Sequence, residues 1–134
     1  MKNIVFDSFA IIALLREESG YEIVRDILVQ ISQHKAEGYI TTVNAGEVYY
    51  MMARKSNLNF AEEALRVLHQ LPIEIVNADF KLSIEAAKIK SKFSLSYADA
   101  YAAALTIQKK ATVVTGDKEF DKLLSIKDFK ILYL

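Results

Sequence analysis

Four acidic residues occupy similar places in this sequence, each close to the end of an apolar segment or near the start of a helical one. Asp7 follows the apolar segment at 3–6, and Asp117 follows "TVVTG". Glu47 and Asp99 each lie near the start of a predicted helix. Carboxylates roughly 4 Å apart repel by up to about 4 kcal/mol per pair at an effective dielectric constant near 20. If the fold gathers these acids, the cluster needs shared protons or a cation.

The chemistry of such a cluster follows from its ligand atoms. Carboxylates offer oxygen only, and the chain contains no cysteine. An all-oxygen ligand set favours a hard divalent ion, Mg²⁺ or Mn²⁺, over zinc. These ions keep several waters and are commonly completed by phosphate oxygens, so that one ion or a pair can activate water for an in-line displacement. The four acids therefore predict phosphoryl chemistry.

Each acid also has a purely structural explanation as a helix cap. Ser96-x-x-Asp99 and Asn44-x-x-Glu47 both have capping-box spacing, and a helix N-terminus favours a negative charge. For any single acid, a cap or a solvated turn is the simpler interpretation. Four acids at equivalent positions favour a common site, and a cap position would help to keep Asp99 ionised.

The segments that must position these acids alternate between strand and helix patterns. Strands are predicted at 3–6, 39–42, 73–76, 112–115 and 130–134, and helices at 8–15, 21–38, 44–57, 60–71, 79–93, 97–110 and 117–124. Gly38 is expected to close one helix and Pro72 to end another. This order predicts an α/β three-layer sandwich with a largely parallel central sheet of about five short strands flanked by helices. Ligands bind beyond the carboxyl ends of such strands, where the four acids are expected.

Length and composition predict one domain over residues 1–134. The chain is 52% hydrophobic, and at this size about two-thirds of the unfolded surface is buried. The lack of cysteine excludes disulfides and thiol nucleophiles and suits a reducing compartment. Asp7 interrupts the first apolar run, and no apolar stretch reaches membrane-spanning length. We therefore expect a soluble, cytoplasmic protein with no membrane partner.

Four segments together resemble a known family: "VFDSFAIIALL", "TTVNAGEVYY", "SLSYADAYAAAL" and "VVTGDKEFDKL". They resemble the PIN domain over nearly the whole chain, and most of all the VapC-type toxins of bacterial and archaeal toxin–antitoxin pairs. The resemblance implies a PIN-like fold and the hydroxyl positions Ser8 and Thr115 beside the acids. It also implies an acidic quartet that binds Mg²⁺ or Mn²⁺ and cleaves RNA, matched here by Asp7, Glu47, Asp99 and Asp117.

The resemblance implies a metal-dependent endoribonuclease. Asp7, Glu47 and Asp99 would hold the main ion. Asp117 would help with a second ion or orient the attacking water, and Thr115 would support the acids. Water, rather than the ribose 2′-hydroxyl, would attack and leave 5′-phosphate and 3′-hydroxyl ends. The expected partners are RNA, a small antitoxin and a second copy of the chain in a homodimer; the alternative is a PIN-like RNA-processing or RNA-binding domain with no antitoxin.

Other protein classes fit these residues less well. A receiver domain needs an acidic pair after its first strand, and a phosphatase with an aspartyl nucleophile needs Asp-x-Asp, where Phe9 stands. An inactive binding module is disfavoured by the intact quartet. Ribonuclease chemistry with two histidines is disfavoured because His34 and His69 are expected to be ordinary helix residues in unrelated contexts.

The remaining candidates are basic and aromatic residues. The formal net charge is zero, with 17 basic and 17 acidic residues, so there is no overall basic surface for nucleic acid. Residues 49–52 are expected to face a protein partner or the core, and Tyr97 and Tyr101 to stack on a base or pack. Solvated helix ends explain the basic residues equally well. The candidate RNA contacts are Arg54, Lys55 and Lys118, followed by Lys109, Lys110 and Lys122.

Overall fold

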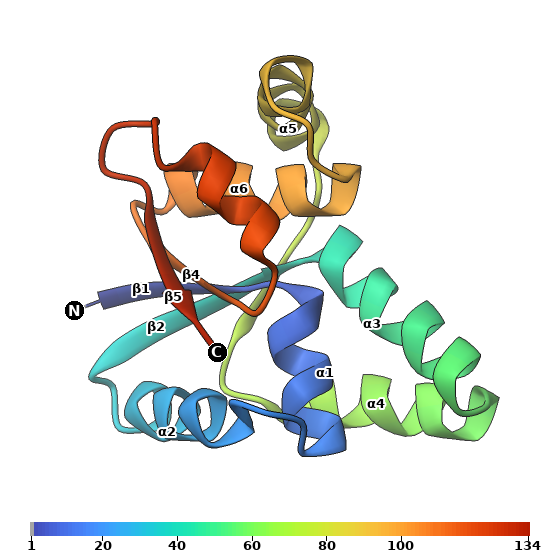
Figure 1. Cartoon of the computed structure of the whole chain (residues 1–134). Coiled ribbons are helices and arrows are strands. Elements are labelled where there is room, and N and C mark those ends of the chain that lie inside the picture. The colour runs from blue at the N-terminus through green and yellow to red at the C-terminus, as the bar shows by residue number, and fades with distance from the viewer. Residues whose placement is uncertain (1) are drawn as a thin grey trace.

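The computed structural model of the protein describes residues 2–134 as alternating strands and helices (Figure 1). In chain order the elements are β1 (Lys2–Phe6), α1 (Ser8–Arg16), α2 (Tyr21–Ser32), β2 (Ala36–Thr41), α3 (Thr42–Lys55), α4 (Leu58–Gln70), β3 (Glu74–Val76), α5 (Phe80–Lys92), α6 (Tyr97–Gln108), β4 (Thr112–Thr115), the 3₁₀ helix η1 (Lys118–Leu123) and β5 (Lys130–Tyr133).

The strands form one sheet in the order β3-β2-β1-β4-β5, and every pairing is parallel. β1 lies at the centre, where Val5 is opposite Tyr39 of β2 on one side and Val113 of β4 on the other. The predicted α/β sandwich with a central sheet is confirmed. Because the strands are parallel, their carboxyl ends share one edge of the sheet.

Two hydrophobic cores lie on the two faces of this sheet. Side chains alternate along a strand, so Ile4 and Phe6 pack into the core formed with α1, α2, α3 and α4. Val5 points the other way, into the core formed with α5, α6 and η1. Figure 1 shows α5 and α6 on one side of the sheet and α1 and α2 on the other. The alternation of apolar side chains along β1 therefore places one hydrophobic core on each face of the sheet.

The prediction of a helix over 21–38 is wrong in its C-terminal part. The helix ends before His34, whose backbone φ of 60° lies in the left-handed region. Gly38 lies inside β2 and does not end a helix. A Cβ atom at Gly38 would lie 2.7 Å from both the Ile31 and Ile73 side chains, so this glycine allows close packing of the strand.

The predicted capping box Asn44-x-x-Glu47 is also wrong. α3 begins directly after β2, and Thr41 is its N-cap, accepting a hydrogen bond of 2.9 Å from the Asn44 amide. Ser96 caps α6 as predicted, accepting from the Asp99 amide at 3.1 Å. Pro72 follows the extended C-cap residue of α4, as its effect on the preceding backbone requires.

Among residues 2–134, no helix combines the length and hydrophobicity needed to span a bilayer.

Candidate active site

Two of the predicted acids follow neighbouring strands. Asp7 comes directly after β1 and is the N-cap of α1, where its Oδ1 accepts a hydrogen bond of 2.9 Å from the Ala10 amide. Asp117 follows β4 and is the N-cap of η1, accepting from the Glu119 amide at 2.9 Å. Since β1 and β4 are adjacent, the two carboxylates lie at the same edge of the sheet.

Thr115 connects these two acids. Its side chain is fully buried at the end of β4, and its hydroxyl donates a hydrogen bond to Oδ2 of Asp7. The same hydroxyl oxygen accepts a hydrogen bond of 2.9 Å from the Asp117 amide. Thr115 therefore holds the Asp7 carboxylate and the Asp117 backbone in one arrangement. This is the place beside the acids that the family resemblance implies for it.

The third acid is contributed by α3. Glu47 is half-buried, and its carboxylate accepts a hydrogen bond from the hydroxyl of Ser8. Ser8 is itself buried at the start of α1, next to Asp7. This contact joins α1 to α3 and brings Glu47 to the edge of the sheet where Asp7 lies.

Asn44 is a structural determinant of the site that the sequence analysis misassigned. Its side chain is fully buried, its Oδ1 accepts from the Thr41 hydroxyl at 2.6 Å, and its Nδ2 donates to the Ala98 carbonyl at 3.2 Å. The second bond ties α3 to α6, so that Glu47 and Asp99 are held near one another. A polar side chain at Asn44, three residues after a threonine at a strand end, was the available sequence signal.

The pKa values show that the four carboxylates act on one another. Burial is the main cause that raises the pKa of Asp7 from 3.8 to about 7, opposed by the bonds from Thr115 and Ala10 and increased by the charges of Glu47 and Asp117. Burial also raises the pKa of Asp99 to about 8, with further contributions from a hydrogen bond to Asp117 and from the charges of the other three acids. The fold therefore gathers the acids that the sequence singled out.

The donor chemistry of this cluster fits a hard divalent ion, because every side-chain donor is a carboxylate or hydroxyl oxygen. As the side chains stand, no three acidic or histidine residues within 2–134 are arranged to hold one ion. Their oxygens are instead engaged with the hydroxyls of Ser8 and Thr115 and with each other. Binding of an ion would therefore require release of shared protons and rotation of the half-buried carboxylates.

The candidate RNA contacts lie at different distances from the acids. Lys118 follows Asp117 directly, is exposed, and places its ammonium 3.6 Å from the centre of the Tyr133 ring. Arg54 and Lys55 lie in the last turn of α3, about 10–12 Å along the helix axis from Glu47. Only Lys118 of these three is adjacent to the acidic edge.

Other candidates have mainly structural contacts. Tyr97 and Tyr101 stack on each other at 5.2 Å between ring centres, and the Tyr101 hydroxyl donates to Ser83 at 2.8 Å. His69 lies in α4 as expected, whereas His34 lies in the turn after α2 and not in a helix. Within 49–52, Met52 is buried in the core, whereas Tyr50 is 47% exposed and free to meet a partner.

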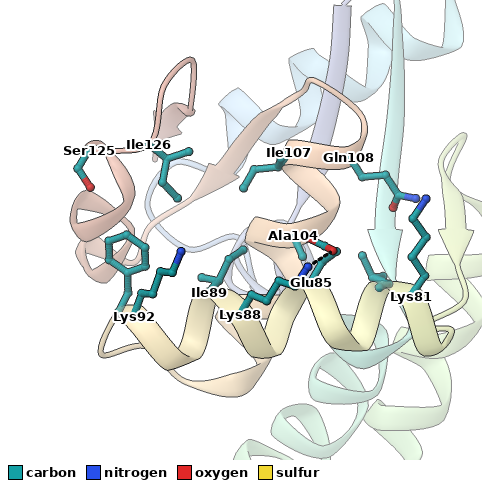
Figure 2. Close-up of a pocket in the computed structure, with 12 residues that line it drawn as sticks. Lys81, Glu85, Lys88, Ile89, Lys92, Ala104, Ile107, Gln108, Ser125 and Ile126 are labelled. Carbon is teal, nitrogen blue, oxygen red and sulfur yellow. Dashed lines mark hydrogen bonds and ion pairs between the residues drawn. The ribbon is translucent and has the colours of Figure 1, made fainter.

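A groove of about 570 Å³ lies between α5, α6 and the segment after η1 (Figure 2). None of the four acids lines it. Its floor is mostly apolar and its rim carries lysines along α5. The lining residues are Lys81, Leu82, Glu85, Lys88, Ile89, Lys92, Phe93, Ala104, Ile107, Gln108, Ser125 and Ile126.

The fold and the acids define an α/β protein with a carboxylate cluster at the carboxyl edge of a parallel sheet. A profile of the PIN domain matches residues 4–124, and the chain belongs to the PIN domain family. A search of the curated proteins found no match.

Solved structures with the same fold include toxin–antitoxin proteins. The VapBC2 structure from Rickettsia felis, bound to a DNA fragment from its promoter, is 14% identical with a TM-score of 0.74, and 98% of each chain is covered. Mycobacterium tuberculosis VapC20, a toxin that cleaves the sarcin-ricin loop, is 14% identical with a TM-score of 0.75, covering 90% of this chain and 95% of that one. FitAcB from Neisseria gonorrhoeae is 20% identical with a TM-score of 0.68, and 96% of each chain is covered.

Proposed function

We propose that this protein is a Mg²⁺- or Mn²⁺-dependent endoribonuclease and the toxin of a VapBC-type toxin–antitoxin pair. The observation that carries the proposal is the gathering of four carboxylates at one sheet edge, where the pKa values of Asp7 and Asp99 are raised. Crowded carboxylates are destabilising without a cation or shared protons. Membership of the PIN domain family and the fold shared with VapC20, a toxin that cleaves RNA, support ribonuclease chemistry.

The roles of the side chains follow from their contacts. Asp7, Glu47 and Asp99 would hold a divalent ion, and Asp117 would share a second ion or orient the attacking water. Thr115 would keep the Asp7 carboxylate in place through its buried hydroxyl, and Ser8 would do the same for Glu47. A divalent ion bound here would supply activation of water and neutralisation of charge on the phosphate.

Purified protein incubated with RNA tests the reaction. We expect cleavage with Mg²⁺ or Mn²⁺, none in EDTA, and products with 5′-phosphate and 3′-hydroxyl ends. These ends follow because water attacks the phosphorus and the ribose 2′-hydroxyl is not used. Undiminished cleavage in EDTA, or 2′,3′-cyclic phosphate ends, would contradict the mechanism.

Expression in cells tests the role as a toxin. The VapBC structures and FitAcB share this fold, which supports a small partner protein that keeps the nuclease silent. We expect toxicity when the chain is expressed alone and rescue when a small partner, encoded by a neighbouring reading frame, is expressed with it. If Asp7→Asn is as toxic as wild type, the toxicity does not come from this site. RNA cleavage without toxicity would favour an RNA-processing domain with no antitoxin.

We also propose that the chain is a single domain over 1–134, acts in the cytoplasm and forms a homodimer. The exposed Tyr50 on α3 offers apolar surface for a second copy. Light scattering of the purified chain measures the oligomeric state, and a monomer at micromolar concentration would contradict the dimer.

A further inference from the structure

Phe9 follows the site residues Asp7 and Ser8 in the chain, and its side chain is partly exposed to solvent. Asp7 and Ser8 are only 2% and 7% exposed, whereas the Phe9 side chain is 44% exposed. All three belong to the turn that starts α1 at the carboxyl edge of β1. A large, partly exposed apolar side chain therefore follows the buried Asp7 by two residues.

The ring of Phe9 is also held in place. A Cβ atom added to Gly116 would lie 2.1 Å from Cε1 and 2.4 Å from Cζ of Phe9, so the ring lies directly on the backbone of Gly116. Any side chain at position 116 would displace it. Gly116 precedes Asp117, so the ring bridges the turn that carries Asp7 and the turn that carries Asp117.

A partly exposed aromatic ring that lies against backbone at this place suits a flat apolar ligand group. Nucleobases stack on such rings with little dependence on sequence, because every base has a π-face. The ring lies between the turns of two acids expected to act on the phosphodiester, so a base stacked on it would belong to a nucleotide next to the scissile phosphate. Tyr97 and Tyr101 are less suited to this role because they stack on each other.

We propose that Phe9 is a stacking platform that binds the base of a nucleotide adjacent to the cleaved bond. The inference rests on the proposed ribonuclease function and specifies which part of the RNA this edge of the protein recognises. Because stacking tolerates any base, Phe9 sets where the strand lies and contributes little to the choice of sequence.

Fluorescence tests contact between the ring and RNA without requiring cleavage. The chain contains no tryptophan, so Phe9→Trp introduces a single tryptophan, which can be excited selectively over the seven tyrosines. In the background of Asp99→Asn and with Mg²⁺ present, a short single-stranded RNA should quench the emission of the Phe9→Trp protein. Phe60→Trp, at an exposed site on α4, is the matched control and should not respond. An equal response of both, no response of Phe9→Trp, or a response only to a partner protein would overturn the proposal.

Kinetics with a modified substrate separate stacking from a structural role. Once the cleavage site is mapped, Phe9→Ala should lower kcat/KM by roughly 5- to 150-fold, which corresponds to about 1–3 kcal/mol of stacking. Phe9→Tyr should keep most of the activity. On RNA with an abasic nucleotide beside the cleavage site, wild type and Phe9→Ala should be equally slow.

Two results of this experiment would count against the inference, and both are distinct from failure of the proposed function. If Phe9→Ala is as active as wild type, or loses the same factor on intact and abasic RNA, the ring does not stack on a base. If wild type itself cleaves no RNA under any metal condition, the ribonuclease proposal fails. The fluorescence titration still decides whether the ring meets RNA in that case.

Discussion

The carboxyl edge of the sheet and the groove between α5 and α6 differ in how they arrange charge. In the groove, Lys88 and Glu85 form an ordinary ion pair at 3.1 Å on the surface of α5 (Figure 2). Such a pair contributes at most about 1 kcal/mol and asks for no ligand. At the edge, four carboxyl groups are gathered, the hydroxyls of Ser8 and Thr115 bond to two of them, and the pKa of Asp7 is raised to about 7. The site of chemistry is thus indicated by the cost of crowded carboxylates and not by the presence of open volume.

Matched removal of a carboxylate in each region gives the largest expected difference. Asp7→Asn should lower RNA cleavage by at least about 100-fold, because loss of a ligand to a divalent ion removes several kcal/mol of transition-state stabilisation. Glu85→Gln removes a carboxylate from the groove and should leave cleavage unchanged. Initial rates at saturating Mn²⁺ measure both. A loss of activity in Glu85→Gln would show that the groove takes part in the reaction.

The second prediction uses the pH dependence of unfolding to measure the free-energy cost of gathering carboxylates at the carboxyl edge of the sheet. The folded-state pKa of Asp7 is about 7, above its usual 3.8, so the native protein holds a proton that the unfolded chain has lost. The contribution of Asp7 to stability in EDTA should therefore be greatest below about pH 4, where the unfolded chain is protonated too, and should be lost as pH rises through about 7, a change on the order of 4 kcal/mol. Urea unfolding at several pH values measures the slope.

Variants show whether the dependence of stability on pH comes from the carboxyl edge of the sheet or from the groove between α5 and α6. Asp7→Asn should reduce the dependence of stability on pH, because the amide carries no proton that titrates; the part that remains belongs to Asp99, whose pKa is also raised. Glu85→Gln should leave it as in wild type. A metal-free wild-type protein that becomes more stable between pH 5 and pH 8 would contradict the crowding of carboxylates.

The third prediction concerns Asp99. Its replacement should lower stability if it acts as a helix cap and raise stability without metal if it belongs to the acidic cluster. If Asp99 mainly stabilises α6 through its charge, Asp99→Asn loses roughly 0.3–1 kcal/mol and melts lower with or without metal. The pKa of Asp99 is raised first by burial and then by its hydrogen bond to Asp117 and the charges of the other three acids, so its ionised form is unfavourable in the folded protein. Asp99→Asn should therefore be more stable than wild type in EDTA at pH 8, by on the order of 2 kcal/mol.

Addition of metal should reverse this order. An ion that binds only the folded state stabilises it by mass action, so wild type should gain more from millimolar Mn²⁺ than Asp99→Asn. Two melting curves for each protein, with EDTA and with Mn²⁺, measure the crossing. If Asp99→Asn melts below wild type by the same amount with EDTA and with Mn²⁺, Asp99 acts mainly as a helix cap.

The smallest effects contrast two glycines, one packed at the edge and one in an open helix. Gly116→Ala would displace the ring of Phe9, which is 44% exposed and can move into solvent, and should lower stability by up to about 1 kcal/mol. Gly46 lies in α3 with no atom within 4 Å of an added Cβ, and Gly46→Ala should raise stability by about 0.5–1 kcal/mol. Thermal unfolding of both variants measures the difference. Equal effects would show that the contact of Phe9 with Gly116 is loose.

The sequence by itself determined the features that depend on local patterns. The alternation of short apolar segments with helical periods predicts a parallel sheet, and Asp7 and Asp117 are predicted at strand ends because they come within one or two residues of the strands. Ser96 was identified as a cap because the rule relates residues only three apart. These features depend on neighbours in the chain, so no knowledge of the packing was needed.

Only the tertiary structure decided the features that depend on which elements meet. The amide of Asn44 reaches the Ala98 carbonyl on another helix, and Gly38 is required by side chains from an earlier helix and from the segment that leads into β3. The raised pKa of Asp7 depends on burial and on the charges of Glu47 and Asp117 from two other parts of the chain, neither of which a local pattern contains. The acids were readable as residues, but their interaction is a property of distances that exist only once the sheet order is set, because Coulomb energy and desolvation depend on separation in space and not along the chain.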